Sequence, residues 1–372
     1  MARENHGGER SLVDTVPFPS DLKYKRPTLG HMADSLAVSH LRLRLIPEQP
    51  LCLPAYNKGN SLRGGFGAAF RKLVCVDMHW ECVDCSLRYT CPYTKVFNPF
   101  IPPDAPQFSG NQNIPRPFVF KPPLSQQTVY APGEPLVFDL VVVGQAVDYL
   151  PYFIVSFREL GAMGFGLNRV RVRLDRVESI DADGGSTLVY DGANNVVRPA
   201  AAMEMALTPA PSTGSGQALS QGAREHGEAP TEDTLTFEFL TPTTLKSGST
   251  ADRAGEVVRQ PAFHHIIKRL RDRVNALSTF YGNGPLAMDF KALGEAAERV
   301  ETVEDHTRWI ERSRVARRRN VTHDLSGFVG SIRFGGHLAQ FLPLLRIGEY
   351  VHVGKNAVFG NGWFVIEDVE PA

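Results

Sequence analysis

The sequence lacks any long hydrophobic run. No apolar stretch in its 372 residues is long enough to cross a bilayer. The first residues are charged and have no apolar core, so we expect no secretory signal. We predict a cytoplasmic protein without a membrane partner. The hydrophobic share of 42% and the charged share of 22% are typical of soluble proteins, and the length suggests roughly two domains.

Cysteine is scarce and unevenly distributed, which argues against a disulfide framework. Four of the five cysteines form one cluster with the spacing C-x6-C-x2-C-x5-C, namely Cys75, Cys82, Cys85 and Cys91. Four thiolates can close a tetrahedral zinc site, so we predict structural zinc with no open position for catalysis. The alternatives are free thiols, an iron–sulfur cluster, or a zinc site in which His79 replaces one cysteine.

Two segments lack the composition of a folded core. Residues 1–34 are polar and show no clear period, which predicts a flexible N-terminal arm. Residues 200–233 are rich in Ala, Pro, Gly, Ser and Thr, which predicts a low-complexity linker. This linker would divide the chain into two halves, 35–199 and 234–372.

Each half has the predicted order strand, helix, strand, strand, helix, strand. Hydrophobic periodicity predicts helices over 61–74 and 150–161 in the first half and over 263–280 and 337–348 in the second. Two β-α-β-β-α-β units form tandem split β-α-β arrangements. We therefore predict an α+β fold of two ferredoxin-like (RRM-like) domains, with the cysteine cluster as a zinc-binding insertion in the first.

The chain also lacks a net charge, since 40 basic residues balance 40 acidic ones. Alternation nevertheless predicts a basic face on two strands that would be neighbours in the first sheet. The residues of this face are His40, Arg42, Arg44, Arg169, Arg171 and Arg173. With helices on the other face, such an open face is where RNA-recognition folds bind a single strand, and arginines attract phosphates. The alternative is a solvated face whose arginines pair with acidic neighbours.

Glycine, by contrast, is concentrated near the end of the chain. Residues 353–364 read VGKNAVFGNGWF, with three glycines, a lysine and two asparagines among aromatic side chains. A glycine-rich loop can bring backbone N–H groups close to a phosphate. It can also be a turn between a helix and the last strand. A separate basic run, RSRVARRRN, lies at 312–320 and could be an ordinary surface charge run.

Three segments support a family resemblance. They are SLRGGFGAAFRKLVC with the cysteine cluster and CPYTKVF, then PYFIVSFRELGAMGFGLNRVRV, and finally GFVGSIRFGG…LPLLRIGEYVHVGKNAVFGNGWF. Together they resemble the CRISPR-associated RAMP superfamily, above all its endoribonucleases that process precursor CRISPR RNA. The likeness covers roughly residues 36–370 apart from the linker. Its most specific element is the strand, helix and glycine-rich loop before the final strand.

The resemblance implies two ferredoxin-like domains with a cleft between them, and CRISPR repeat RNA as the partner. In the family the glycine-rich loop contacts RNA backbone; the matching residues here are Gly354, Lys355, Asn356, Gly360, Asn361 and Gly362. Family members cut without a catalytic metal. The ribose 2′-hydroxyl attacks the adjacent phosphate and leaves a 2′,3′-cyclic phosphate and a 5′-hydroxyl. The protein would then retain the product and could join other CRISPR effector subunits.

The resemblance does not identify the catalytic residues. Many members place a histidine in or just after the first helix, and 61–74 contains none. Our candidates are His40, His79, His323, Tyr56 and Lys58. Histidine suits proton transfer near neutral pH, but each of these could equally be a surface or structural histidine. The alternative functions are a non-catalytic RNA-binding RAMP subunit and a zinc-stabilised module unrelated to RNA.

Overall fold

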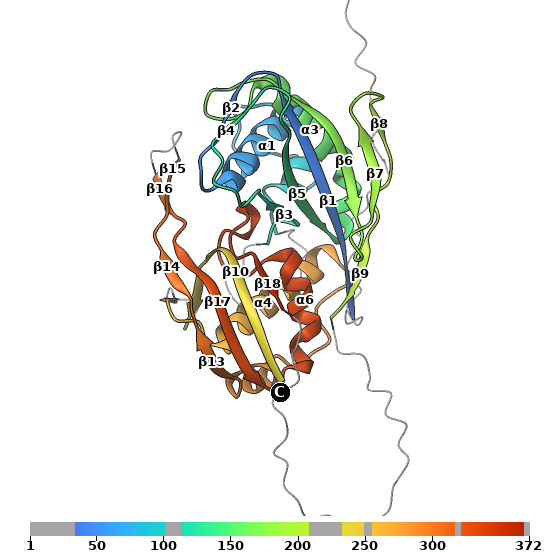
Figure 1. Cartoon of the computed structure of the whole chain (residues 1–372). Helices are drawn as coiled ribbons and strands as arrows, with labels where there is room; N and C mark the ends of the chain where they lie inside the picture. Colours follow the sequence, from blue (N-terminus) through green and yellow to red (C-terminus); the bar gives the residue numbers. More distant parts are fainter. Residues whose placement is uncertain (1–33, 102–113, 208–232, 249–254, 317–320, 368–372) are drawn as a thin grey trace, which may run out of the picture.

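The computed structural model describes residues 34–101, 114–207, 233–248, 255–316 and 321–367. It shows a mixed α/β protein built on two antiparallel main sheets, one in each half of the chain (Figure 1). The predicted N-terminal arm lies outside the described residues except for its last residue. Most of the predicted linker lies outside them too.

The first sheet has the strand order β3-β5-β1-β6-β7-β8, with β9 paired to the start of β1. Its strands are β1 (Ser35–Pro47), β3 (Phe118–Lys121), β5 (Leu136–Val143), β6 (Val172–Ile180), β7 (Ser186–Asp191), β8 (Val196–Val197) and β9 (Met203–Ala206). Helices α1 (Lys58–Val74) and α3 (Leu150–Met163) pack on one face, where Phe66 stacks on Phe153 with ring centroids 4.8 Å apart. The alternating leucines of β1 face this aromatic core.

The second sheet has the order β13-β17-β10-β18, with β14 also paired to β17. Its strands are β10 (Asp233–Thr243), β13 (Glu301–Asp305), β14 (Arg308–Ile310), β17 (Gly327–Gly336) and β18 (Phe364–Ile366). Helices α4 (Phe263–Tyr281) and α6 (Leu342–Val351) pack on it, as the predicted helical period requires.

Short elements complete the chain. They are β2 (Leu51–Cys52), β4 (Val129–Tyr130), β11 (Leu245–Ser247), β12 (Glu256–Val258), β15 (Ser313–Ala316), β16 (Val321–Asp324), α2 (Pro92–Val96), α5 (Phe290–Glu298), and the 3-10 turns η1 (Gly144–Tyr149), η2 (Ala339–Phe341) and η3 (Ala357–Phe359). None of the helices in the described ranges is both long enough and apolar enough to cross a membrane.

The strand orders are consistent with the predicted ferredoxin-like arrangement. In each half the first strand is central, flanked by the third and fourth strands of the β-α-β-β-α-β series, and the second strand lies beyond the third. Several boundaries differ from prediction, and the helix expected over 337–348 spans Leu342–Val351 instead. The last strand of the first series begins at Val172 rather than at residue 168, because Arg169 takes a left-handed φ of 51° in a turn closed by a bridge between Phe165 and Val170. Residues 203–206, predicted as linker, form β9.

The two halves are joined by a shared hydrophobic core. Leu36, Val38 and Val141 of the first sheet lie in the same buried cluster as Phe263 and Phe364 of the second half. The face of the first sheet opposite α1 and α3 is therefore covered at one end. The prediction that this whole face is open was wrong, because apolar residues continue the basic face at its N-terminal end and pack on the second half.

The glycine-rich segment 353–364 lies at the interface between the two halves, which we call the seam. Its turn η3 contacts both α1 and β3, and Val358 belongs to the core of the first half although it follows α6 of the second. A Cβ added at Gly59 of α1 would lie 1.9 Å from the carbonyl oxygen of Phe359. Only a residue without a side chain allows the helix and the loop to approach this closely.

Gly59→Ala should therefore lower the thermal unfolding midpoint, because overpacking a close contact costs about 1–3 kcal/mol. The matched control is Gly64→Ala in the same helix, where an added Cβ meets nothing within 4 Å. That control should be neutral or stabilising, since alanine favours helix more than glycine does. Circular dichroism melts of both variants test this, and equal midpoints would contradict the close contact.

Candidate functional site

A cleft between the halves has a volume of about 460 Å³ and is lined by residues of both. Tyr56 and Lys58 come from the loop before α1 and its first turn, Gln126 comes from the segment after β3, and Arg308 and Arg312 come from the second half. The cleft therefore brings together two of the predicted catalytic residues.

Tyr56 presents an exposed phenol to this cleft. Its side chain is 47% exposed, and its hydroxyl donates to Oε1 of Gln126 at 3.2 Å. The guanidinium of Arg312 lies 4.1 Å from the centre of its ring. This cation–π contact holds a positive charge beside a phenol hydroxyl, a combination that can bind and protonate an oxyanion.

Lys58 is placed differently from what its sequence position suggested. It is buried, and its Nζ donates to the carbonyl oxygens of Ala55 at 3.1 Å and Ser125 at 2.5 Å. Burial lowers the pKa of Lys58. An ammonium has three donors, so two of them hold the Tyr56 loop against the segment after β3.

The three predicted histidines do not meet in this cleft, and no described residue lining it is a histidine. His40 lies on β1 and pairs with Asp139 of β5 at 2.9 Å. The side chain of His79 is 97% exposed and contacts Asp77 within the cysteine segment. His323 is exposed on β16, in the hairpin that follows Arg312.

The basic face of the first sheet is largely paired. Arg42 binds Asp139 at 2.8 Å, and Asp175 lies between Arg44 at 3.6 Å and Arg173 at 2.7 Å. This pairing is the alternative that the sequence left open. Arg169 and Arg171 are exposed at its end, where Arg158, Arg171 and Arg173 border a second hollow of about 370 Å³. Anion-binding capacity is therefore concentrated near the turn before β6.

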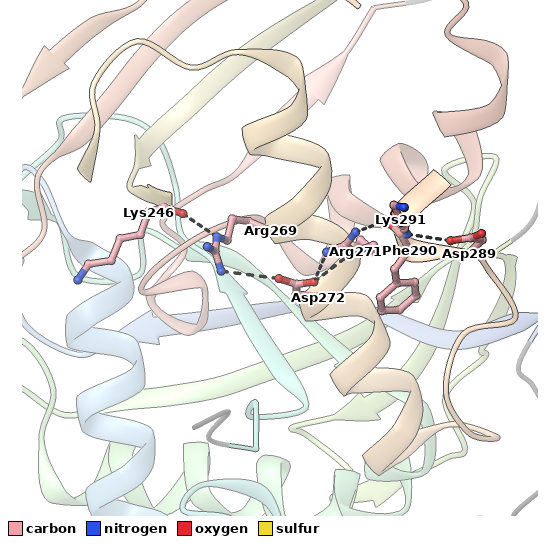
Figure 2. Close-up of polar contacts among 7 residues, drawn as sticks. All are labelled: Lys246, Arg269, Arg271, Asp272, Asp289, Phe290 and Lys291. Atoms are coloured by element: carbon pink, nitrogen blue, oxygen red, sulfur yellow. Dashed lines mark hydrogen bonds and ion pairs between the residues drawn. The ribbon is translucent and has the colours of Figure 1, made fainter. Parts of the chain in front are cut away.

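A third basic hollow lies beside α4. Its volume is about 320 Å³, and its cationic lining residues are Lys246, Arg269, Arg273 and Lys355. Figure 2 shows that Arg269 donates to the carbonyl oxygen of Lys246 (2.7 Å) and reaches Asp272 (3.7 Å), whereas the Lys246 side chain extends away from Arg269. Burial lowers the pKa of Lys355, and the neighbouring Lys246 lowers it further. Two ammonium groups that repel each other favour a bound anion between them.

The remaining residues of the glycine-rich loop are turned inward. Gly360, Asn361 and Gly362 are buried, and the N–H of Gly362 donates to the carbonyl oxygen of Pro242 at 3.1 Å. The N–H of Lys355 is likewise bound, to the carbonyl oxygen of Thr244 at 3.1 Å. The loop presents Lys355, which is exposed, and the partly exposed Gly354 and Asn356.

Comparison with known families assigns the second half. Residues 237–364 match the family model of the CRISPR-associated endoribonuclease Cas6. This part of the chain is similar to Cas6. The predicted resemblance to CRISPR-associated RAMP endoribonucleases is thereby confirmed. Residues 36–202 match a separate family model, described as an N-terminal domain.

Individual relatives are more distant. An uncharacterized protein of Archaeoglobus fulgidus is 28% identical over 339 residues, which are 90% of this chain and 99% of the relative. Thermus thermophilus Cas6 is 18% identical, with 90% of this chain and all of that one covered, at a TM-score of 0.46. A structure described as a RAMP protein binding different RNA substrates is 9% identical, with 89% of this chain and all of that one covered, at a TM-score of 0.44. The family assignment rests on the sequence model.

The sequence did not reveal the buried cationic residues where the second half meets the first sheet. Lys121 of β3 is largely buried, with its Nζ 5.1 Å from the ring centre of Tyr350 and 4.9 Å from that of Trp363. Burial lowers the pKa of Lys121 to about 8, although Asp139 and Glu349 oppose the shift. The only signal was a lysine within the apolar strand PFVFKPP.

Two other ionisable groups at this interface between the halves, Asp139 and His352, also have lowered pKa values. Burial would raise the pKa of Asp139, but hydrogen bonds from His40 and Arg42 outweigh it and hold the value at about 2. His352 is fully buried and stacks on Trp363. Its Nδ1–H donates to the backbone carbonyl oxygen of Asn361 at 3.2 Å, so Nδ1 carries the proton. Burial keeps the pKa of His352 well below its usual value, with Lys121 adding to the shift, so this histidine is neutral.

Lys121 should make stability depend on pH. Its folded-state pKa of about 8 lies below the ordinary lysine value. Between the two values the unfolded chain binds more protons, so the free energy of unfolding should rise with pH in this window, by roughly 1 kcal/mol per pH unit. Denaturant titrations at several pH values should show this slope in the wild type and lose it in Lys121→Met.

The control for this experiment is Lys291→Met, since the side chain of Lys291 is 86% exposed. It should keep the wild-type slope. If Lys121→Met and the wild type show the same dependence between pH 8 and 10, the lowered pKa is contradicted.

Proposed function

We propose that this protein cleaves CRISPR repeat RNA within precursor transcripts, and that it does so in the cleft between its two halves. The observation that carries the proposal is the Tyr56–Arg312 pair, whose members come from opposite walls of the cleft. The second half, which is similar to Cas6, supplies the wall with Arg308 and Arg312. We include in the proposal a tandem ferredoxin-like architecture, which the strand orders support.

RNA supplies its own nucleophile, so the reaction needs proton transfer and neutralisation of charge. The 2′-hydroxyl loses its proton to solvent water as its oxygen forms a bond to phosphorus, and the bond from phosphorus to the 5′-oxygen breaks. The products are a 2′,3′-cyclic phosphate and a 5′-hydroxyl. Arg312 and Arg308 would stabilise the extra negative charge on the phosphorane. Tyr56 would donate a proton to the departing 5′-oxygen, and no catalytic metal takes part in these steps.

Lys58 has a positioning role in this scheme. Its hydrogen bonds to the carbonyl groups of Ala55 and Ser125 hold the backbone immediately before Tyr56 and immediately before Gln126. In this proposal His40, His79 and His323 take no part in the cleavage reaction, because they do not line the cleft. His40 instead orients Asp139 on the basic face.

RNA binding would extend from the cleft along the basic hollows. Arg171 and Arg173 border one hollow, and Lys246 and Lys355 border another. Phosphates held there would keep the product bound after the cut. Such a product complex would also be a natural unit for assembly with other CRISPR effector subunits.

The second candidate function is a non-catalytic RNA-binding RAMP subunit. Two observations favour it: no described lining residue of the cleft is a histidine, and Lys58 is occupied by backbone carbonyl groups. Incubation with end-labelled repeat RNA in excess EDTA distinguishes the two. Cleavage at one position with a cyclic phosphate end supports the nuclease, whereas tight binding without cleavage supports the subunit.

Tyr56→Phe should lower the rate of RNA cleavage by about 100-fold or more, because it removes the proton donor and keeps the ring. RNA affinity should change little, since the cation–π partner of Arg312 remains. Tyr89→Phe, outside the cleft, is the matched control and should cut at the wild-type rate. Single-turnover rates measured with saturating protein separate cleavage from binding. A wild-type rate for Tyr56→Phe would remove Tyr56 from the mechanism.

Lys355→Ala and Arg171→Ala should each weaken RNA binding and reduce its dependence on salt, because each removes one phosphate contact. The slope of log K against log salt should fall in magnitude by about 1 for each. Arg299→Ala is the charge-matched control, since Arg299 is exposed at the end of α5 away from these hollows. Filter binding at several salt concentrations gives both quantities, and unchanged slopes would exclude these two contacts.

A further inference from the structure

The segment 75–91 between α1 and α2 has little regular structure to hold it. It consists of turns, and its apolar side chains are unusually exposed: Val76 is 72% exposed, Val83 57% and Trp80 52%. Such a segment buries too little apolar surface to pay for its own ordering. Another interaction must therefore fix its conformation.

The four cysteines of this segment border a single cavity of about 30 Å³. Each is a free, half-buried thiol: Cys75 ends α1, Cys91 precedes α2, and Cys82 and Cys85 share a turn in which the N–H of Cys85 donates to the carbonyl oxygen of Cys82 at 3.4 Å. The fifth cysteine, Cys52, lies on β2 and does not border the cavity. The four cysteines are spread along the segment, yet all of them border the same small cavity.

Positive charge is fixed beside this space. Arg71, in the last turn of α1, donates through one guanidinium nitrogen to the carbonyl oxygens of Trp80 at 2.6 Å and Met78 at 3.3 Å. Arg88 donates to the carbonyl oxygen of Val83 at 2.6 Å. A site with four thiolates and one divalent cation carries a net charge of about −2, so the Arg71 guanidinium, which lies beside Cys75 and Cys82, suits it.

We propose that Cys75, Cys82, Cys85 and Cys91 bind one Zn²⁺ ion, which holds the segment together. In the described part of the chain no three His, Cys, Asp or Glu side chains are already gathered as a ligand set. The thiols must therefore turn toward the cavity until each sulfur is about 2.3 Å from the metal. The cavity that all four border leaves room for this rotation.

The metal would act on stability and not on the reacting atoms. Tyr93 of α2 packs on Phe70 of α1 with ring centroids 5.6 Å apart, and Phe97, which directly follows α2, packs on Phe66 of α1 at 5.9 Å. Zinc would tie the end of α1 to the start of α2 and so secure this packing. The cleft residue Lys58 lies at the opposite end of α1.

The first test is the metal content of the full-length protein, purified under reducing conditions without chelators. We expect one zinc per chain and no stoichiometric iron or acid-labile sulfide. Cys85→Ser should lose most of the zinc and unfold at a lower temperature. Cys52→Ser, the matched control, should keep both the zinc and the wild-type melting temperature.

A second measurement remains informative if Cys85→Ser does not fold. Wild-type protein stripped of zinc and given Co²⁺ should show the intense d–d bands and sulfur-to-cobalt charge-transfer absorption of a tetrahedral thiolate site. Protein that holds neither zinc nor added Co²⁺ overturns the proposal, and so does stoichiometric iron with sulfide. Neither measurement involves RNA, so its result is independent of the proposed nuclease activity.

Discussion

The close approach of the glycine-rich turn to α1 is the constraint on which the rest of the structure depends. The carbonyl group of Phe359 lies where a side chain on Gly59 would be, and Val358 completes the core of the first half. Arg63 of α1 also covers the ring of Phe359, 4.9 Å from its centre. These contacts fix the distance between the halves, and this distance sets the width of the cleft and the meeting of Tyr56 with Arg312.

Beside this contact, the seam contains more buried charge than an apolar interface would tolerate without cost. Arg273 is partly buried, burial lowers its pKa to about 10, and its Nε donates to the carbonyl oxygen of Val351 at 2.8 Å. Lys121 is held between two aromatic faces. Buried cations are expensive unless something compensates them. Their presence together at one interface is typical of a surface selected to meet anions as well as to hold two domains together.

Much of the fold could be predicted from the sequence, because strand alternation and helical period depend on local pattern. The leucines of β1 and the apolar stripe of α4 face the cores as expected. The pairing of the arginines could not be predicted, since it depends on register: Arg42 faces Asp139 across one ladder and Glu178 across the other. The turn at Arg169 was missed because nothing in NRVRV marks a left-handed residue.

The candidate site was predictable only in part, for the same reason. Tyr56 and Lys58 are close in sequence, so their nearness followed from the loop before α1. Arg312 is distant in sequence, and its contact with Tyr56 exists only through the docking of the halves. Histidine chemistry suggested His40 and His323, but chemistry alone does not place a side chain in a cleft. The inward turn of Gly360, Asn361 and Gly362 is likewise a property of tertiary packing.

The origin of Tyr56 and Arg312 in different halves has a consequence for inactivation. Neither half contains the pair by itself, so the proposed site exists only while the two halves are correctly docked. A small opening of the seam would separate the phenol from the guanidinium while both hydrophobic cores stay folded. Loss of activity on warming would then precede the loss of secondary structure, and the gap between the two temperatures would measure how firmly the halves are held together.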